Sequence, residues 1–126
     1  MNQNPGTVYI LDDEIFVRKL LEIIARSAGM TFRSFGNAVD FLDVWSPDMT
    51  GCIVTDLYMP TISGLELLKR MKEQNCTMPV ILLTAAEDPK LVEEALQHGA
   101  YACLAKPIDK ASLVSMLKEV MAPNPG

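Results

Sequence analysis

The sequence lacks the features that mark membrane, secreted and nucleic-acid-binding proteins. No apolar run approaches the roughly 20 residues that a transmembrane helix needs. The N-terminal segment MNQNPGTVYIL has neither the basic start nor the long apolar centre of a signal peptide. Positive charge is scarce, because 11 Lys and Arg residues face 16 Asp and Glu residues and leave a net charge of −5. We therefore predict a cytoplasmic protein that makes no direct contact with nucleic acid and no contact with a membrane.

Cysteine and histidine patterns that build zinc sites or disulfide frameworks are also missing. The three cysteines, Cys52, Cys76 and Cys103, are odd in number and far apart. Cys52 and Cys103 lie in apolar runs, which predicts buried, reduced thiols. The only histidine, His98, precedes Gly99 at the predicted end of a helix, and this place favours a role at the helix terminus over a catalytic one.

The composition is that of a folded domain. Hydrophobic residues make up 49% of the 126 residues and charged residues 21%, so a core can form and a disordered chain is excluded. We predict one domain over residues 1–126, with an ordered core of about 7–121 and short loose termini. The final residues, APNPG, fit either a natural end or a linker to a further domain.

Short apolar runs alternate with amphipathic stretches along the whole chain. The predicted strands are TVYIL (7–11), TFRSF (31–35), GCIVT (51–55), PVILL (79–83) and YACLA (101–105). The first, third and fourth are almost entirely apolar, which is typical of strands covered on both faces of a parallel sheet. TFRSF alternates between apolar and polar residues, as an edge strand does.

Five helices are predicted between and after these strands. In the first, Arg18, Lys19, Glu22 and Arg26 form the polar face. Gly29 and Gly99 are expected to end the first and fourth helices, and Asp88-Pro89 to begin the fourth. The apolar stripes are, helix by helix, Val17, Leu20, Leu21, Ile24 and Ala28; Ala38, Phe41, Leu42 and Trp45; Leu65, Leu68 and Met71; Leu91, Val92, Ala95 and Leu96; and Leu113, Met116, Leu117 and Val120. Regular β-α alternation predicts a doubly wound α/β domain.

Charged and hydroxyl residues follow four of the five strands. Asp12 and Asp13 end the first strand, Asp56 the third, Thr84 the fourth and Lys106 the fifth. The second strand ends in the uncharged turn Phe35-Gly36-Asn37. Because parallel strands end at one edge of the sheet, we expect the four charged side chains and Thr84 to converge there.

Three neighbouring carboxylates need positive charge to remain ionised. Lys106 supplies one positive charge, and clustered Asp oxygens are suited to Mg²⁺. Such a site favours phosphoryl chemistry, with Asp56 as the nucleophile and the Asp12–Asp13 pair as the metal ligands. Considered one at a time, these residues also have purely structural explanations. Asp13 would cap the first helix, and Lys106-Pro107 would form a turn.

The chain resembles the receiver domain of two-component response regulators. The resemblance runs from Thr7 to about Met121 and depends on the motifs VYILDDE, VTDLYMPTISGLELL, PVILLTAAED and HGAYACLAKPI. It implies a flavodoxin-like (βα)5 domain with a parallel five-stranded sheet in the order 2-1-3-4-5.

The resemblance also implies roles for the site residues. Asp56 would be the phosphoacceptor. Mg²⁺ would be held by Asp13 directly, by Asp12 partly through water, by Asp56 and by the main-chain carbonyl of Tyr58. Thr84 would move toward the bound phosphoryl group.

The same resemblance predicts a side-chain role for Lys106 and several backbone features. Lys106 would pair with the phosphoryl group, and its peptide bond to Pro107 would be cis. Met59 and Pro60 would form the turn after the phosphoacceptor. Gly64 would relieve crowding where the third helix begins.

The implied function is that of a signalling switch. A histidine kinase, a phosphotransfer protein or a small phosphodonor would donate the phosphoryl group. The domain would catalyse its own phosphorylation and slow dephosphorylation without being a turnover enzyme. The face made by the fourth helix, fifth strand and fifth helix would bind an output domain or a second copy. The family usually has an aromatic residue where Cys103 stands here, while Tyr101 lies two residues earlier.

Tyr58 and Ala86 occupy positions that, in the family, face the approach to the phosphoryl group. A bulky Tyr58 would shield that group from water, so we expect slow self-dephosphorylation.

Three functions other than a signalling switch are alternatives for this sequence. A receiver-like docking module that works without phosphorylation is favoured by Cys103 and opposed by the complete set of acids, hydroxyl and lysine. A phosphatase with an aspartate nucleophile would carry a second Asp two residues after it, where Tyr58 stands. A flavin-binding protein would need a phosphate-binding loop after the first strand, which the sequence does not have.

Overall fold

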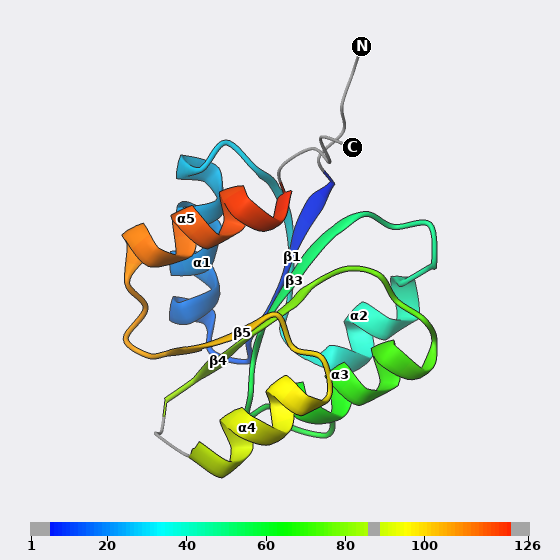
Figure 1. Cartoon of the computed structure of the whole chain (residues 1–126). Coiled ribbons are helices and arrows are strands. Elements are labelled where there is room, and N and C mark those ends of the chain that lie inside the picture. Colours follow the sequence, from blue (N-terminus) through cyan, green and yellow to red (C-terminus); the bar gives the residue numbers. More distant parts are fainter. Residues whose placement is uncertain (1–5, 86–88, 122–126) are drawn as a thin grey trace.

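The computed structural model describes residues 6–85 and 89–121. Strands and helices alternate along these residues (Figure 1). The strands are β1 (Thr7–Leu11), β2 (Thr31–Phe35), β3 (Gly51–Asp56), β4 (Val80–Thr84) and β5 (Ala102–Ala105). The helices are α1 (Ile15–Ser27), α2 (Ala38–Val44), α3 (Gly64–Glu73), α4 (Pro89–Gln97) and α5 (Lys110–Met121).

The strands form one parallel sheet in the order β2-β1-β3-β4-β5. This order and the flavodoxin-like (βα)5 fold confirm the prediction. The observed bounds of β1 and β2 are those predicted. Those of β3 and β5 differ by one residue at one end, and β4 is shifted by one residue at both ends. The predicted fourth helix cap, Asp88, lies outside the described residues.

Helices cover both faces of the sheet and create two separate cores (Figure 1). α2, α3 and α4 pack on one face, and α1 and α5 pack on the other. β1 divides its side chains between them, because successive residues of a strand point to opposite faces. Tyr9 and Leu11 belong to the first core, and Val8 and Ile10 belong to the second.

The central strands are more buried than the edge strands. Nearly all residues of β1, β3 and β4 are buried, as their continuous apolar sequences predicted. β2 lies at one edge and exposes alternate residues. β5 lies at the other edge and is only partly covered.

Some predicted core positions are wrong. Leu20 of α1 and Leu96 of α4 are exposed, at 43% and 48% of their surface. The buried stripes are narrower than the apolar pattern: α1 buries Leu21, Ile24 and Ala25, and α4 buries Ala95. The sheet covers only one side of each helix, so apolar residues at the margin of the pattern remain in solvent.

The cysteines are free thiols. Cys52 is buried in β3, and burial raises its pKa to about 12. Cys103, which we also expected to be buried, is only partly covered because β5 is an edge strand. Burial nevertheless raises the pKa of the Cys103 thiol, so both groups stay protonated at neutral pH.

The described helix termini follow the expected chemistry. Gly29 and Gly99 adopt φ values of +77° and +95° after α1 and α4, in the left-handed region that favours glycine. Asn37 and Ser63 cap α2 and α3, where their side-chain oxygens accept hydrogen bonds from the amides of Asp40 and Glu66. His98 follows α4 and is exposed. None of the described helices combines the length and hydropathy that crossing a bilayer requires.

The start of α3 lies directly under the end of β3. The Gly64 amide donates to the Leu57 carbonyl at 2.8 Å. A Cβ at Gly64 would lie 2.4 Å from the Asp56 carbonyl oxygen and 3.0 Å from the Leu57 Cα. The absence of a side chain at Gly64 therefore allows the helix to begin this close to the strand, as the sequence predicted.

We expect Gly64→Ala to lower the free energy of unfolding by about 1–3 kcal/mol, because the added methyl group overlaps rigid backbone. Urea unfolding followed by circular dichroism measures the change. Gly36→Ala is the matched control, since its Cβ would meet only the end of the Arg18 side chain at 3.4 Å. Equal losses in the two variants would contradict the interpretation.

Candidate phosphoryl-transfer site

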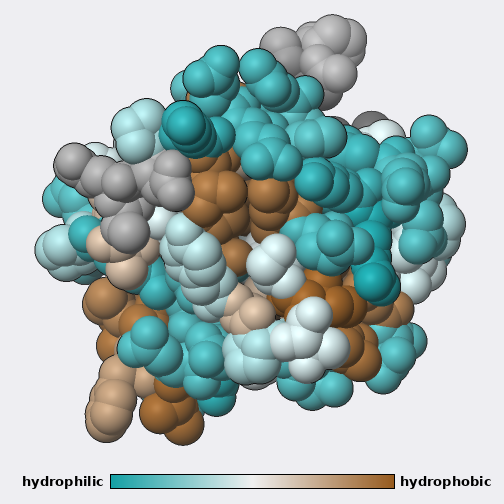
Figure 2. All heavy atoms as spheres, turned by 90° about the horizontal axis from the view of Figure 1, so that it is seen from below, coloured by the Kyte–Doolittle hydropathy of each residue, from teal (hydrophilic) through white to brown (hydrophobic). Residues whose placement is uncertain are grey.

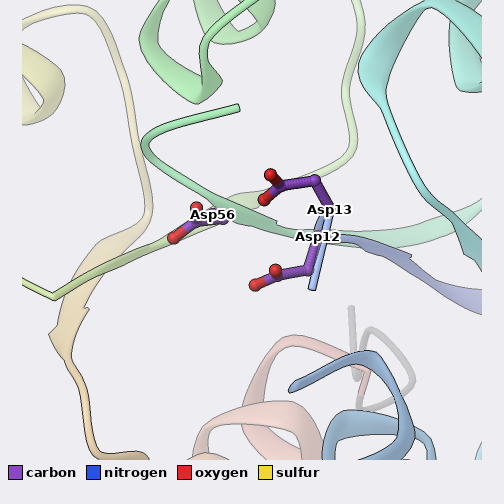
Figure 3. Close-up of side chains that lie close together, drawn as sticks. All are labelled: Asp12, Asp13 and Asp56. Atoms are coloured by element: carbon purple, nitrogen blue, oxygen red, sulfur yellow. The ribbon is translucent and has the colours of Figure 1, made fainter. Parts of the chain in front are cut away.

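The three predicted acids converge at the carboxyl ends of β1 and β3 (Figure 3). One carboxylate oxygen from each of Asp12, Asp13 and Asp56 lies within 4.8 Å of the others. The sheet register explains the meeting. Leu11 of β1 pairs with Thr55 of β3, so the residues that follow them lie side by side.

Asp12 is fully buried, and both its main chain and its carboxylate make hydrogen bonds or ion pairs. Its amide donates to the Phe35 carbonyl at 3.2 Å. Its Oδ1 accepts a hydrogen bond from the Glu14 amide at 2.9 Å, and its Oδ2 lies 3.3 Å from Lys106 Nζ. Its carbonyl accepts a hydrogen bond from Arg18 Nη1 at 2.7 Å. Asp12 therefore has one defined orientation.

Asp13 is exposed, although its carboxylate belongs to the same cluster. The alternative that Asp13 caps α1 is wrong. The cap position is occupied by Glu14, and its side chain makes no capping hydrogen bond. Asp13 is therefore not engaged at the helix terminus and faces the other two acids (Figure 3).

Lys106 lies between two of the acids. Its Nζ is 2.9 Å from Asp56 Oδ1 and 3.3 Å from Asp12 Oδ2. Its amide donates to the Thr84 carbonyl at 2.8 Å, which ties the loop after β5 to the end of β4. The peptide bond from Lys106 to Pro107 is cis, as the resemblance predicted.

Thr84 and Tyr58 complete the set of predicted residues. Thr84 is buried at the end of β4, one residue beyond Leu83, which pairs with Asp56. Tyr58 follows Asp56 by two residues and exposes 48% of its surface. Ala86 lies outside the described residues. The sheet thus brings together the acids, Thr84 and Lys106 as predicted.

Burial and the charges of Lys106 and the neighbouring acids determine the electrostatics of the site. Burial raises the pKa of Asp56, and the charges of Asp12 and Asp13 raise it further, while Lys106 opposes both effects. Burial lowers the pKa of Lys106, but Asp56 and Asp12 outweigh it, so that the pKa lies above its usual value. The ammonium group stays charged, and the site carries more negative than positive charge.

The donor set fits Mg²⁺. Three carboxylates offer oxygen atoms close enough to share one ion, and oxygen is the ligand that this hard cation prefers. An ion here would also relieve the repulsion that raises the pKa of Asp56.

The sequence pattern misplaced one residue of this region. Arg18 was assigned to the polar, solvent-facing side of the first helix, yet it reaches back to the Asp12 carbonyl. The available signal was its place in the first turns of a helix that begins directly after the acids. Helical side chains point toward the N-terminus of their helix.

Comparison with known proteins identifies close relatives. A family profile described as the response regulator receiver domain matches residues 8–118. The chain is 36% identical over 116 residues to the transcriptional regulatory protein FixJ of Bradyrhizobium diazoefficiens, an alignment that covers 92% of this chain and 57% of that protein. It is 40% identical over 111 residues to FixJ of Azorhizobium caulinodans, covering 88% of this chain and 53% of that protein.

The solved structures agree with the sequence comparison. The crystal structure of FixJ-N superposes with a TM-score of 0.85 at 31% identity, and covers 100% of this chain and 99% of that chain. The chain thus spans about half the length of the FixJ proteins that it matches.

We expect Asp56→Asn to raise the free energy of unfolding of the metal-free protein at neutral pH by on the order of 1 kcal/mol, because it removes a buried charge from an acidic cluster. The wild-type protein has a raised folded pKa, so it loses stability as the pH rises from 3.8 through that folded value. The advantage of the variant should therefore disappear below pH 3.8. Urea unfolding with a chelator present measures it.

Asp43→Asn is the control for this experiment, since Asp43 is exposed on α2 and its replacement should change stability by no more than about 0.5 kcal/mol. A destabilised Asp56→Asn protein at neutral pH would show that the Lys106 contact outweighs the repulsion.

Proposed function

The chain belongs to the response regulator receiver domains, and from this premise we propose that it is a phosphorylation-controlled signalling switch with Asp56 as phosphoacceptor. The observation that carries the proposal is the contact of Lys106 with Asp56 inside a cluster of three acids. A structural ion pair would need one carboxylate. Two further acids next to it leave an excess of negative charge, which a divalent cation would neutralise, and the same cation would offset the charge of an incoming phosphoryl group.

The chemistry requires a carboxylate oxygen to attack phosphorus. Asp56 supplies that oxygen, the bond between phosphorus and the donor breaks, and its electron pair leaves with the donor. With a phosphohistidine donor the leaving group is imidazole. Mg²⁺, when bound by Asp12, Asp13, Asp56 and the Tyr58 carbonyl, would neutralise the charge of the carboxylates and the phosphoryl oxygens.

Lys106 and Thr84 would stabilise the product. Lys106 Nζ already lies 2.9 Å from Asp56 Oδ1, so it would reach a phosphoryl oxygen attached to Asp56. The Thr84 hydroxyl, on the neighbouring strand, would donate to another oxygen. Charge-assisted contacts of this kind are strong, and they would favour the conformation in which Thr84 and Lys106 lie close to the phosphoryl group.

A protein donor is supported by the surface beside the acids. α1 begins two residues after Asp13, and it exposes the apolar side chains Ile15, Phe16, Leu20 and Ile23. Phe16 alone exposes 86% of its surface. Figure 2 views the molecule from the edge where the strands end, and hydrophobic residues reach the surface there in separate patches. We propose that a histidine kinase or phosphotransfer protein docks on this edge.

The output surface is proposed to be the face of α4, β5 and α5. Tyr101, just before β5, donates a hydrogen bond to Glu119 of α5, and a groove beside it is lined by Ala111, Ser112, Ser115, Met116 and Glu119. An output domain or a second copy would bind here. Cys103 is small, so less apolar area would change exposure than with an aromatic residue.

The second candidate is a docking module that works without phosphorylation. The small, partly covered Cys103 favours it, because the usual aromatic residue of the switch is missing. The two candidates differ in their response to a phosphodonor.

We expect the purified protein to gain the mass of one phosphoryl group at Asp56 when it is given acetyl phosphate and Mg²⁺, and Asp56→Asn to gain none there. Mass spectrometry of intact and digested protein makes the measurement. Asp43→Asn provides the charge-matched control and should be phosphorylated as the wild type is. An unmodified wild-type protein would favour the docking module.

We expect Tyr58→Asn to shorten the lifetime of the phosphorylated protein several-fold, because the smaller polar side chain admits water to the acyl phosphate. Loss of the phosphoryl group after removal of the donor gives the half-life. Tyr58→Phe keeps the ring and should retain the slow rate. Equal half-lives in Tyr58→Asn and wild type would refute the shielding role.

A further inference from the structure

We propose that Arg18 is a positioning residue for the acidic cluster, acting through the main chain of Asp12. The inference rests on the proposed function in one respect: it takes the cluster to be a Mg²⁺ site. The residue itself makes no proposed contact with metal or phosphoryl group.

The contacts of Arg18 connect three segments. Its side chain leaves the second turn of α1, and Nη1 donates to the Asp12 carbonyl at 2.7 Å. The guanidinium also lies against the loop after β2, where a Cβ on Gly36 would be 3.4 Å from Nη1. The neighbouring Phe35 carbonyl, at the end of β2, accepts a hydrogen bond from the Asp12 amide. Arg18 thus connects α1 with the residue after β1 and with the loop after β2, on either side of the turn between β1 and α1.

The Asp12 carbonyl belongs to the peptide group that joins Asp12 to Asp13. A hydrogen bond to this oxygen restricts rotation of that peptide plane. The orientation of the plane determines the direction in which the Asp13 side chain projects from the backbone. Asp12 has other restraints, through Glu14 and Lys106. Asp13 is exposed, so its convergence with Asp12 and Asp56 depends on the backbone.

Simple electrostatics predicts the opposite effect of removing Arg18. The guanidinium is a positive charge close to a site for a cation, so its loss should tighten Mg²⁺ binding if charge alone matters. If Arg18 positions the acids, its loss should weaken binding. The sign of the change therefore distinguishes the two roles.

The test uses Arg18→Met, which keeps an unbranched side chain and removes the donor and the charge. Calorimetric titration with Mg²⁺ alone should show affinity about tenfold weaker than in the wild type, a typical effect of losing a group that orients ligands. Arg18→Lys restores a donor and should recover part of the loss. Lys19→Met removes the adjacent charge, whose side chain is 67% exposed, and should bind Mg²⁺ as tightly as the wild type or slightly more so.

A second measurement requires no metal. The Glu14 amide donates to Asp12 Oδ1, so hydrogen exchange at Glu14, followed by NMR, reports the order of this turn. In Arg18→Met it should exchange faster, while the Ile53 amide, bonded to the Pro79 carbonyl in the core, should keep its rate. A uniform increase at both amides would indicate general destabilisation and overturn the inference.

The outcomes separate this inference from the proposed function. If the wild-type protein binds no Mg²⁺, the metal part of the proposed function fails, and the Glu14 exchange rate alone decides the role of Arg18. If the wild type binds Mg²⁺ and Arg18→Met binds it equally or more tightly, the proposed function stands and the positioning role is wrong.

Discussion

The mutual repulsion of three carboxylates at one sheet edge is the constraint on which the site depends. Asp12 and Asp56 are buried and Asp13 completes the cluster, so the site has a high cost in the absence of a cation. Lys106 offsets part of that cost through contacts with both buried acids. The remaining excess of negative charge is a physical reason to expect a divalent ion here.

The backbone around the acids is restrained from several elements. Asp12, which follows β1, is held by the end of β2 and by Arg18 of α1, and the end of β3 is approached closely by α3 at Gly64. The loop after β5 is joined to the end of β4 by the bond from the Lys106 amide to the Thr84 carbonyl. Lys106, which contacts Asp56, is therefore linked through its main chain to the end of β4 as well.

Much of this arrangement could be predicted from the sequence. The apolar runs of β1, β3 and β4 indicated central strands, and the alternation in β2 indicated an edge. Parallel strands end at one edge, so Asp12, Asp13, Asp56, Thr84 and Lys106 could be expected to meet. Among the wrong predictions are residues whose environment depends on distant elements: Leu20 and Leu96 are apolar yet exposed, and Arg18 is polar yet turned toward the site.

By itself, the sequence determined the order of the strands and helices, the residues at the strand ends and the chemistry those residues can perform. These properties follow from local periodicity and residue type. Only the tertiary structure decided which side of each helix the sheet covers, that Asp12 is buried while Asp13 is exposed, and that Lys106 lies between Asp12 and Asp56. Contacts between residues as distant in the chain as Asp12 and Lys106 depend on how the strands pack side by side, so local sequence patterns predict that these residues converge but not which of their atoms come into contact.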